Sequence, residues 1–313
     1  MNPRSIDFGR FNAGLNGLHN IEFLKGNLYE PVQGKKFDLI LSNPPFVISP
    51  ESGHSYLDSG MESDRFAQKL VSKAPEHLAE GGYFQMILNW AHISGHKWQD
   101  RLRKWVAGTG CDTWVILRHT RNRSAYAMNW INDNYPSGVM TERYDQWMAY
   151  FEQEGIRGVS SGFLFMRRRR AAKNWFRTDE WKEAMRHPVG DDILRGFAAQ
   201  DFLIKMSRDR DLINARLTAA PGVRLEQQSK PSGGGWQVVS ARLRKVEGLT
   251  YTHAVNQPVA NLIARCDGQR PLKELLSALA ASQKKTLDSI LPVYLGVVRQ
   301  LIARSLMLPP GKD

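Results

Sequence analysis

The feature that most constrains the fold is a short, almost uninterrupted apolar run, Phe37 to Ser42, which is followed closely by two prolines. A strand that is apolar on both faces is typical of the interior of a parallel sheet, where helices cover each side. Proline has no N–H group to donate to a strand ladder, so Pro44 and Pro45 end the strand. The segment therefore predicts a buried strand whose carboxyl end opens into a loop.

Further strand and helix signals alternate along the first half of the chain. Apolar or alternating runs predict strands, and apolar residues at helical spacing predict helices. We expect helices at 3–18, 65–79, 97–107 and 142–153, and strands at 21–24, 83–89, 113–117 and 160–166. This alternation indicates an α/β fold with a mostly parallel sheet.

The pattern changes after about residue 170. The glycines of Ser229–Gly235 predict a flexible loop or the tip of a hairpin. We expect a strand at 236–243 and helices at 179–185, 196–206, 255–266, 272–280 and 290–305. The sequence thus predicts two domains, 1–170 and 171–313. For the second, two interpretations stay open: a mostly helical module, or a winged-helix-like module from about residue 236.

Composition limits the class of protein. A chain of 313 residues with 42% hydrophobic content can build buried cores. Its apolar runs are far shorter than the roughly 20 residues of a membrane helix, and the amino terminus lacks a basic region followed by an apolar core. We therefore expect a cytoplasmic protein without a membrane span. Cys111 and Cys266 are interpreted as core thiols, and the spacing of the histidines predicts no metal site.

The chain is basic, with a formal net charge of +12. Such a bias favours phosphate-rich or otherwise acidic partners without proving nucleic-acid binding. The sharpest concentration is the run Arg167–Arg170, directly after the strand expected at 160–166. Two interpretations stay open: a solvated strand end, or a contact with nucleic acid or a ribosomal surface.

The residues after the Phe37–Ser42 strand suit the handling of a planar nitrogen. Ligands of open α/β sheets collect at the carboxyl ends of strands, where Asn43 stands. The side-chain carbonyl of Asn43 and the main-chain carbonyl of Pro44 can both accept hydrogen bonds from an NH2 group. Phe46 can stack on a flat substrate, and Pro44 and Pro45 stiffen the backbone that directs those carbonyls.

The whole segment Phe37–Phe46 closely resembles the catalytic motif of class I methyltransferases that modify exocyclic amines and amides. The flanking segments Asn2–Gly17 and Gly26–Glu30 resemble the same family, so the likeness covers about residues 1–166. It implies a Rossmann-like sheet and S-adenosyl-L-methionine as the methyl donor. It also implies Asn43 and Pro44 as catalytic residues and Pro45 and Phe46 as substrate-binding residues.

The resemblance also places Asn27 and Leu28 at the cofactor. Relatives commonly carry Asp at the position of Asn27, where a carboxylate accepts from the adenine amine of the cofactor. An Asn amide oxygen accepts without charge, which predicts a weaker contact. A plain turn role for Asn27 stays open.

The front of the chain departs from the family pattern. Members begin with a strand, a Gly-rich loop that packs on the cofactor, and a second strand that ends in an acidic residue; none of these is found before Asn2. In the family's strand order, three-two-one-four-five-seven-six, the strand at 21–24 would pair only with the second strand. We therefore expect an N-terminally incomplete sheet, an isolated edge at Phe37–Ser42, and poor cofactor binding by the chain alone.

These observations favour an S-adenosyl-L-methionine-dependent N-methyltransferase. Two features slightly favour the exocyclic amine of a nucleic-acid base as the substrate. They are the net charge of +12 and Phe46, where glutamine-modifying relatives more often carry Tyr. The expected partners are a nucleic acid or ribosomal component, and no membrane. The alternatives are a protein glutamine N-methyltransferase and an inactive remnant that binds RNA or protein.

Overall fold

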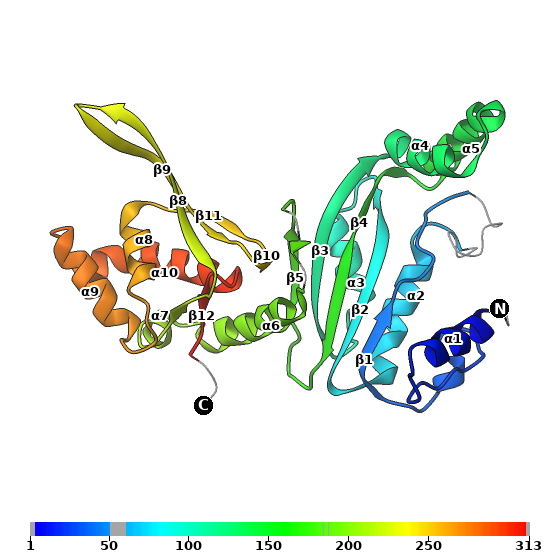
Figure 1. Cartoon of the computed structure of the whole chain (residues 1–313), viewed down its shortest axis with the longest axis horizontal. Coiled ribbons are helices and arrows are strands. Elements are labelled where there is room, and N and C mark those ends of the chain that lie inside the picture. Colours follow the sequence, from blue (N-terminus) through cyan, green and yellow to red (C-terminus); the bar gives the residue numbers. More distant parts are fainter. Residues whose placement is uncertain (1–3, 51–60, 184, 187, 311–313) are drawn as a thin grey trace. The chain divides into compact units, whose positions relative to one another are not determined.

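The computed structural model describes residues 4–50, 61–183, 185, 186 and 188–310 (Figure 1). The chain divides into two compact units, Met1–Lys182 and Glu183–Asp313. The first unit extends past the domain boundary that the sequence predicts at residue 170, because residues 176–180 add a strand to its sheet. Asn2 and Pro3, which carry part of the family resemblance, lie outside the described residues.

The first unit is built on a five-stranded mixed sheet in the order β1-β2-β4-β3-β5. β1 pairs in parallel with β2, and β3 pairs in parallel with β5, while β4 runs antiparallel to both of its neighbours (Figure 1). The strands are β1 (Phe37–Ser42), β2 (Leu78–Ile93), β3 (Cys111–Asn122), β4 (Ile156–Arg168) and β5 (Phe176–Glu180). The predicted α/β, Rossmann-like fold class is confirmed, and β4 makes the sheet mixed.

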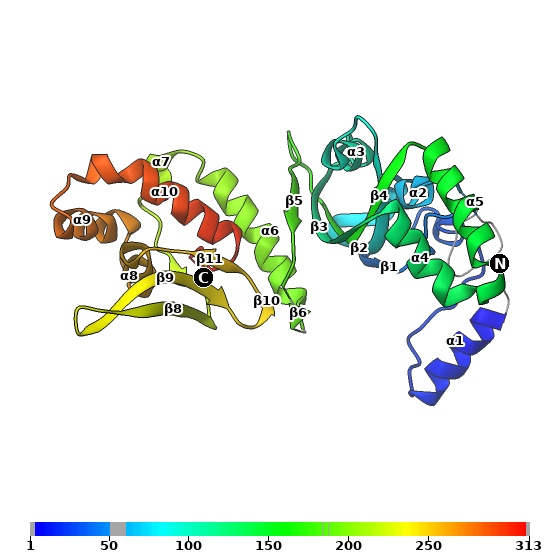
Figure 2. The same cartoon turned by 90° about the horizontal axis from the view of Figure 1, so that it is seen from above.

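Two groups of helices pack on this sheet. α2 (Arg65–Lys73) and α3 (Trp98–Trp105) bury their apolar sides against one face, and α2 continues into the 3-10 turn η2 (Ala74–His77). α4 (Arg123–Asn134) and α5 (Met140–Gln153), separated by the turn η3 (Ser137–Val139), form a second core with residues at the ends of β2 and β4. Figure 1 shows the α4–α5 pair beyond one end of the sheet, and Figure 2, seen from above, shows α2 and α3 on one side of it.

The amino-terminal part differs from the expected elements. α1 (Arg4–Leu15) is present, but residues 21–24 form no strand. Their alternation cannot produce a strand without a neighbour to bond, and in this sheet β2 is the only described neighbour of β1. The predicted isolated edge at β1 is confirmed, whereas burial on both faces is wrong, because Leu39 and Leu41 are 52% and 67% exposed.

Strand boundaries also differ from the sequence prediction. Glu80, Gly81 and Gly82 were expected to end a helix, but they lie inside β2, which begins at Leu78. The helix expected at 179–185 is absent, because residues 176–180 bond to β3 as β5 and Met185–Arg186 form the short strand β6. α4 was not predicted. The two cysteines are buried free thiols, as expected.

The second unit combines a helical core with a long hairpin that is mostly exposed. β8 (Val223–Ser232) and β9 (Gly235–Lys245) form that hairpin with Gly233 and Gly234 at its tip, as the glycine run predicts, and β11 (Thr252–Ala254) joins β9. The remaining elements are α6 (Gly190–Lys205), α7 (Asp209–Leu212), β7 (Thr218–Ala219), β10 (Gly248–Leu249), α8 (Gln257–Ala264), α9 (Leu272–Ser282), α10 (Leu287–Ala303) and β12 (Met307–Leu308). The four longer helices share one hydrophobic core. A winged-helix relationship of this unit remains a proposal.

Candidate functional site

The motif that follows β1 stands at the carboxyl end of the sheet. β1 ends at Ser42, opposite Met86 of β2, and β2 continues to Ile93 beside the loop. Asn43 is exposed, Pro44, Pro45 and Phe46 are half-buried, and Val47 and Ile48 are buried. Within the described part of the chain, the Asn43 side chain makes no hydrogen bond. Its amide oxygen is therefore available to a ligand.

Tyr126 of α4 holds the segment behind the motif. Its hydroxyl accepts a hydrogen bond from the Ile48 N–H at 3.1 Å and contacts Asn89 Nδ2 at 2.8 Å. Burial raises the pKa of Tyr126 to about 12, so the hydroxyl stays neutral at physiological pH. Asn89 Oδ1 has no hydrogen-bond partner among the described residues. Neither Tyr126 nor Asn89 was singled out from the sequence.

A second anchor fixes the start of α2. The carboxylate of Asp64, which is 4% exposed, accepts from the Ala91 N–H at 2.8 Å and from Arg101 Nη2 at 2.8 Å. Arg101 also donates to the Ala91 carbonyl. The Tyr150 hydroxyl of α5 accepts from the Ser63 N–H at 2.7 Å. The chain directly after residues 51–60, which lie outside the described residues, is thus tied to β2, α3 and α5.

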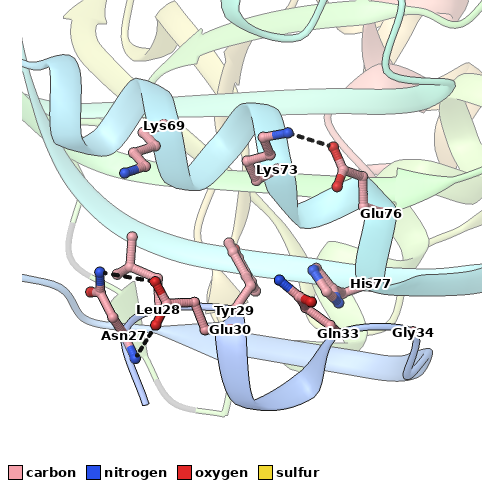
Figure 3. Close-up of a pocket in the computed structure, with 10 residues that line it drawn as sticks. All are labelled: Asn27, Leu28, Tyr29, Glu30, Gln33, Gly34, Lys69, Lys73, Glu76 and His77. Carbon is pink, nitrogen blue, oxygen red and sulfur yellow. Dashed lines mark hydrogen bonds and ion pairs between the residues drawn. The ribbon is translucent and has the colours of Figure 1, made fainter.

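Asn27 and Leu28, the predicted cofactor residues, line a cavity of about 310 Å³ beside α2 (Figure 3). The Asn27 N–H donates to Glu30 Oε2 at 3.3 Å and Asn27 Nδ2 lies 3.5 Å from Glu30 Oε1. Among the described residues, the amide oxygen of Asn27 has no hydrogen-bond partner. Leu28 has a φ of 50°, a left-handed conformation that costs a leucine free energy. Lys69 and Lys73 of α2 face the cavity from the other side (Figure 3).

The structure does not join the two predicted halves of the site. The cavity beside Asn27 reaches Gly34 and His77, which precede β1 and β2, whereas Asn43 and Pro44 follow β1. Across the described residues, no hydrogen bond or ion pair connects Asn27 or Leu28 with Asn43 or Pro44. The predicted cofactor residues and the predicted catalytic residues therefore lie toward opposite ends of β1.

The arginine run is mostly engaged inside the protein. The buried carboxylate of Asp112 accepts from Arg167 Nη2 at 2.6 Å, and Arg169 donates to both of its oxygens. Arg168 donates to the Thr109 carbonyl. The Arg170 side chain is 91% exposed, and its Nε atom lies 3.9 Å from Glu80 Oε2. Contact with a nucleic acid is thus left mainly to Arg170, and the main role of the run is to hold β3 and β4 together.

The pKa of Asp112 follows from these partners. Burial alone would raise it, but hydrogen bonds from Arg169, Arg167, the Trp175 N–H and Asn174 outweigh burial and hold the pKa below its ordinary value. Asp112 is therefore a structural anion. Elsewhere in the described residues, no group of His, Cys, Asp or Glu side chains has the arrangement of a metal site. None of the described helices combines the length and apolarity that a membrane crossing requires.

Comparison with known proteins agrees with the motif and its surroundings. Residues 1–107 match the methyltransferase small domain, and residues 195–309 match a domain of unknown function, DUF7782. The chain is 32% identical over 96 residues to the release factor glutamine methyltransferase of Xylella fastidiosa, covering 28% of this chain and 35% of that protein. It is 31% identical over 115 residues to the enzyme of the same description from Aquifex aeolicus, covering 33% and 40%.

A third relative is the ribosomal protein uL3 glutamine methyltransferase of Xanthomonas campestris, which is 33% identical over 73 residues, or 20% of this chain and 24% of that protein. The chain thus spans well under half the length of these curated relatives. The matched segment contains the motif at Asn43–Phe46, which stands at the carboxyl end of β1. The segment 1–107 of this chain is therefore a member of the methyltransferase small-domain family of class I S-adenosyl-L-methionine-dependent methyltransferases.

Proposed function

We propose that this chain holds the side-chain amide of a protein glutamine for methylation on nitrogen by S-adenosyl-L-methionine. The observation that carries the proposal is Asn43, an exposed amide with no side-chain hydrogen bond in the described structure, which stands at the carboxyl end of β1 within the motif. The relatives reported above are named for glutamine methylation of a release factor and of ribosomal protein uL3, which supports this substrate class.

The chemistry follows from the acceptors at the motif. A primary amide presents two N–H groups, and the Asn43 Oδ1 atom and the Pro44 carbonyl can accept one each, which would fix the plane of the amide and the direction of its nitrogen. Positive charge develops on that nitrogen as a methyl group is added. Neutral carbonyl dipoles therefore stabilise the transition state more than the ground state.

Other residues of the motif would orient and enclose the amide. Phe46, which is half-buried, can pack on the flat amide group. Pro44 and Pro45 have fixed φ angles and no N–H groups, so they limit the motion of the Pro44 carbonyl and do not compete for acceptors. These roles of Asn43, Pro44, Pro45 and Phe46 belong to the proposal.

The described residues fit only part of the cofactor. The unpartnered Asn27 Oδ1 atom suits the adenine amine, and Leu28 offers an apolar contact beside it. The cavity beside them is also lined by the charged groups of Lys73 and Glu76, which form an ion pair at 2.9 Å and do not suit an adenine ring. When bound, S-adenosyl-L-methionine would supply an electrophilic methyl group on sulfur.

The exocyclic amine of a nucleic-acid base is the second candidate substrate. The sequence favours it slightly through Phe46 and the net charge of +12. The internal contacts of Arg167, Arg168 and Arg169 weaken the local part of that argument, and the relatives support the protein substrate instead. A non-catalytic role in binding RNA or protein is the third possibility, and the same assay tests it.

The proposal is tested by incubating the full chain with methyl-labelled cofactor and, separately, a purified bacterial release factor, ribosomal protein uL3, or ribosomal RNA. We expect label in a protein glutamine, and we expect Asn43→Ala to reduce the rate by about 100-fold or more. Asn132→Ala, which truncates an exposed asparagine of α4, is the matched control and should leave the rate unchanged. Label in RNA alone, or no transfer to any of the three, would contradict the proposal.

A further inference from the structure

The α4–α5 pair lies where it can reach the motif. β3 runs in the same direction as β1 and β2, because both β3 and β2 are antiparallel to β4. α4 begins directly after β3, so the pair stands at the carboxyl ends of β1 and β2 (Figure 1). This is the end of the sheet at which Asn43 and Pro44 follow β1.

Two tyrosines of this pair bind main-chain N–H groups on either side of residues 49–62. The Tyr126 hydroxyl of α4 accepts from Ile48, and the Tyr150 hydroxyl of α5 accepts from Ser63. Ile48 is 1% exposed, so water cannot easily replace its acceptor. A buried N–H without a partner is costly, which makes the Tyr126 contact a strong constraint on the backbone at Ile48.

The Tyr126 ring itself has little freedom. It is 3% exposed and packs against Trp147 and Phe151 of α5 with ring centroids 6.1 and 6.3 Å away. Asn89 of β2 contacts the hydroxyl at 2.8 Å through an amide atom. If that atom is Nδ2, the hydroxyl accepts two bonds; if the amide is turned over, the hydroxyl donates to Oδ1 and still accepts from Ile48. In both orientations Asn89 fixes the oxygen that binds the Ile48 N–H.

The motif is therefore held at two points. Before Asn43, the backbone is fixed because Leu41 and Ser42 pair with β2. After Phe46, the backbone is fixed where Ile48 meets Tyr126. Between these points, Pro44 and Pro45 restrict rotation and provide no N–H group of their own. The direction of the Pro44 carbonyl thus depends on both anchors.

We propose that Tyr126 is a positioning residue that aims the Asn43 and Pro44 carbonyls at the substrate nitrogen, with Asn89 fixing its hydroxyl. This inference rests on the proposed function, because it assigns Tyr126 a role in the same site. Tyr126 does not touch the substrate amide. It acts through the Ile48 N–H, 78 residues away in sequence.

The test compares Tyr126→Phe with Tyr144→Phe in the full chain. Both changes remove one hydroxyl from the α4–α5 pair, but the Tyr144 hydroxyl bonds to Ser124 Oγ at 2.8 Å and, among the described residues, makes no hydrogen bond to the motif segment. Tyr126→Phe keeps the ring and its packing against Trp147 and Phe151, so the fold should persist. Near-ultraviolet circular dichroism and the melting temperature check this for both variants.

Two measurements then decide the proposal. Amide hydrogen exchange at Ile48 should become about 10- to 100-fold faster in Tyr126→Phe and stay unchanged in Tyr144→Phe. In the methyl-transfer assay on a release factor, kcat should fall about tenfold in Tyr126→Phe, while KM changes little, because positioning is lost and binding is not. A general loss of stability would also lower the apparent kcat, because less of the enzyme would be folded, so the melting temperatures and circular dichroism spectra of the two variants are needed to identify that case.

The outcomes separate the two proposals. Unchanged exchange at Ile48 would overturn the anchoring role, and faster exchange with wild-type kcat would overturn the positioning role. If the wild-type chain methylates none of the offered substrates, the proposed function fails. The exchange rates of Ile48 would then still decide whether Tyr126 anchors the motif segment.

Discussion

Replacing Asp112 by Asn should destabilise the first unit strongly. The Asp112 side chain is fully buried and accepts hydrogen bonds from Arg167, Arg169, Asn174 at 3.2 Å and the Trp175 N–H at 3.1 Å. The variant keeps one acceptor oxygen but turns an NH2 group toward guanidinium donors. Breaking a buried ion pair from one side costs about 3–5 kcal/mol, because the remaining charge stays buried.

The expected value lies at the low end of that range. Arg167 is 13% exposed and Arg169 is 32% exposed, so water can partly solvate Arg169 in the variant. A loss of about 3 kcal/mol in a unit of this size lowers the melting temperature by about 6–12 °C. Differential scanning calorimetry of the full chain at pH 7 measures this shift.

Glu80→Gln is the matched control because Glu80 pairs with Arg170 of the same run, with side chains 52% and 91% exposed. An exposed pair contributes less than about 1 kcal/mol, so this variant should melt within about 4 °C of the wild type. The pKa of Asp112 is depressed, so its contribution is present above the ordinary value of 3.8 and is lost as pH falls below it. Equal melting temperatures for Asp112→Asn and Glu80→Gln at pH 7 would refute the structural role of the arginine run.

Two further predictions concern the sheet. A methyl group at Gly162 of β4 would lie 2.1 Å from the Ile116 carbonyl oxygen, so Gly162→Ala should lower the free energy of unfolding in urea by about 1–3 kcal/mol. Gly138→Ala is the control, because its methyl group would meet no atom within 4 Å and should change that free energy little. Equal losses in the two variants would contradict this packing. Burial, and then the charge of Arg101, lower the pKa of His92, whose Nε2 lies 2.6 Å from Ser160 Oγ. The free energy of unfolding should therefore decrease as pH falls below 6.5, the ordinary pKa of histidine. His92→Gln should make this decrease smaller in melting curves recorded between pH 7.5 and 5.5. An unchanged pH dependence in the variant would show that His92 is not its cause.

Local patterns in the sequence predict the elements that carry the motif. The apolar run at Phe37–Ser42 coincides with β1, and α3 and α5 lie within a few residues of their expected bounds. α2 begins at the expected Arg65 but ends at Lys73, well before the predicted end at residue 79. The family resemblance predicts the loop in which Asn43 stands. These features depend on neighbours in the sequence, so a single chain is enough to find them.

Elements that depend on distant partners were missed. β5 contains Asp179 and Glu180, which are poor strand residues, but its backbone pairs with β3 and is thereby stabilised. Residues 21–24 have strand character and no strand beside them. The start of α4 had a usable signal, because the Asn122 side chain caps it by accepting from the Ala125 N–H.

The contacts around the site were beyond sequence analysis for the same reason. Ile48 and Tyr126 are 78 positions apart, and Asp112 and Arg167 are 55 apart. Such pairs follow from the arrangement of β2, β3 and β4, which no short pattern encodes. The arginine run illustrates the difficulty, because four consecutive cations resemble a binding surface until their buried carboxylate is located.

The exposed edge of β1 determines how this protein should behave in concentrated solution. Its outer N–H and C=O groups have no partner strand among the described residues, and Leu39 and Leu41 lie uncovered beside them. Natural sheets usually protect such edges with charges, prolines or bulges, and β1 has only Asp38 and the prolines that follow it. An extended segment of another molecule can add to this edge through main-chain hydrogen bonds. The six residues of β1, which lead directly into the motif, are thus a place where the protein is prone to self-association.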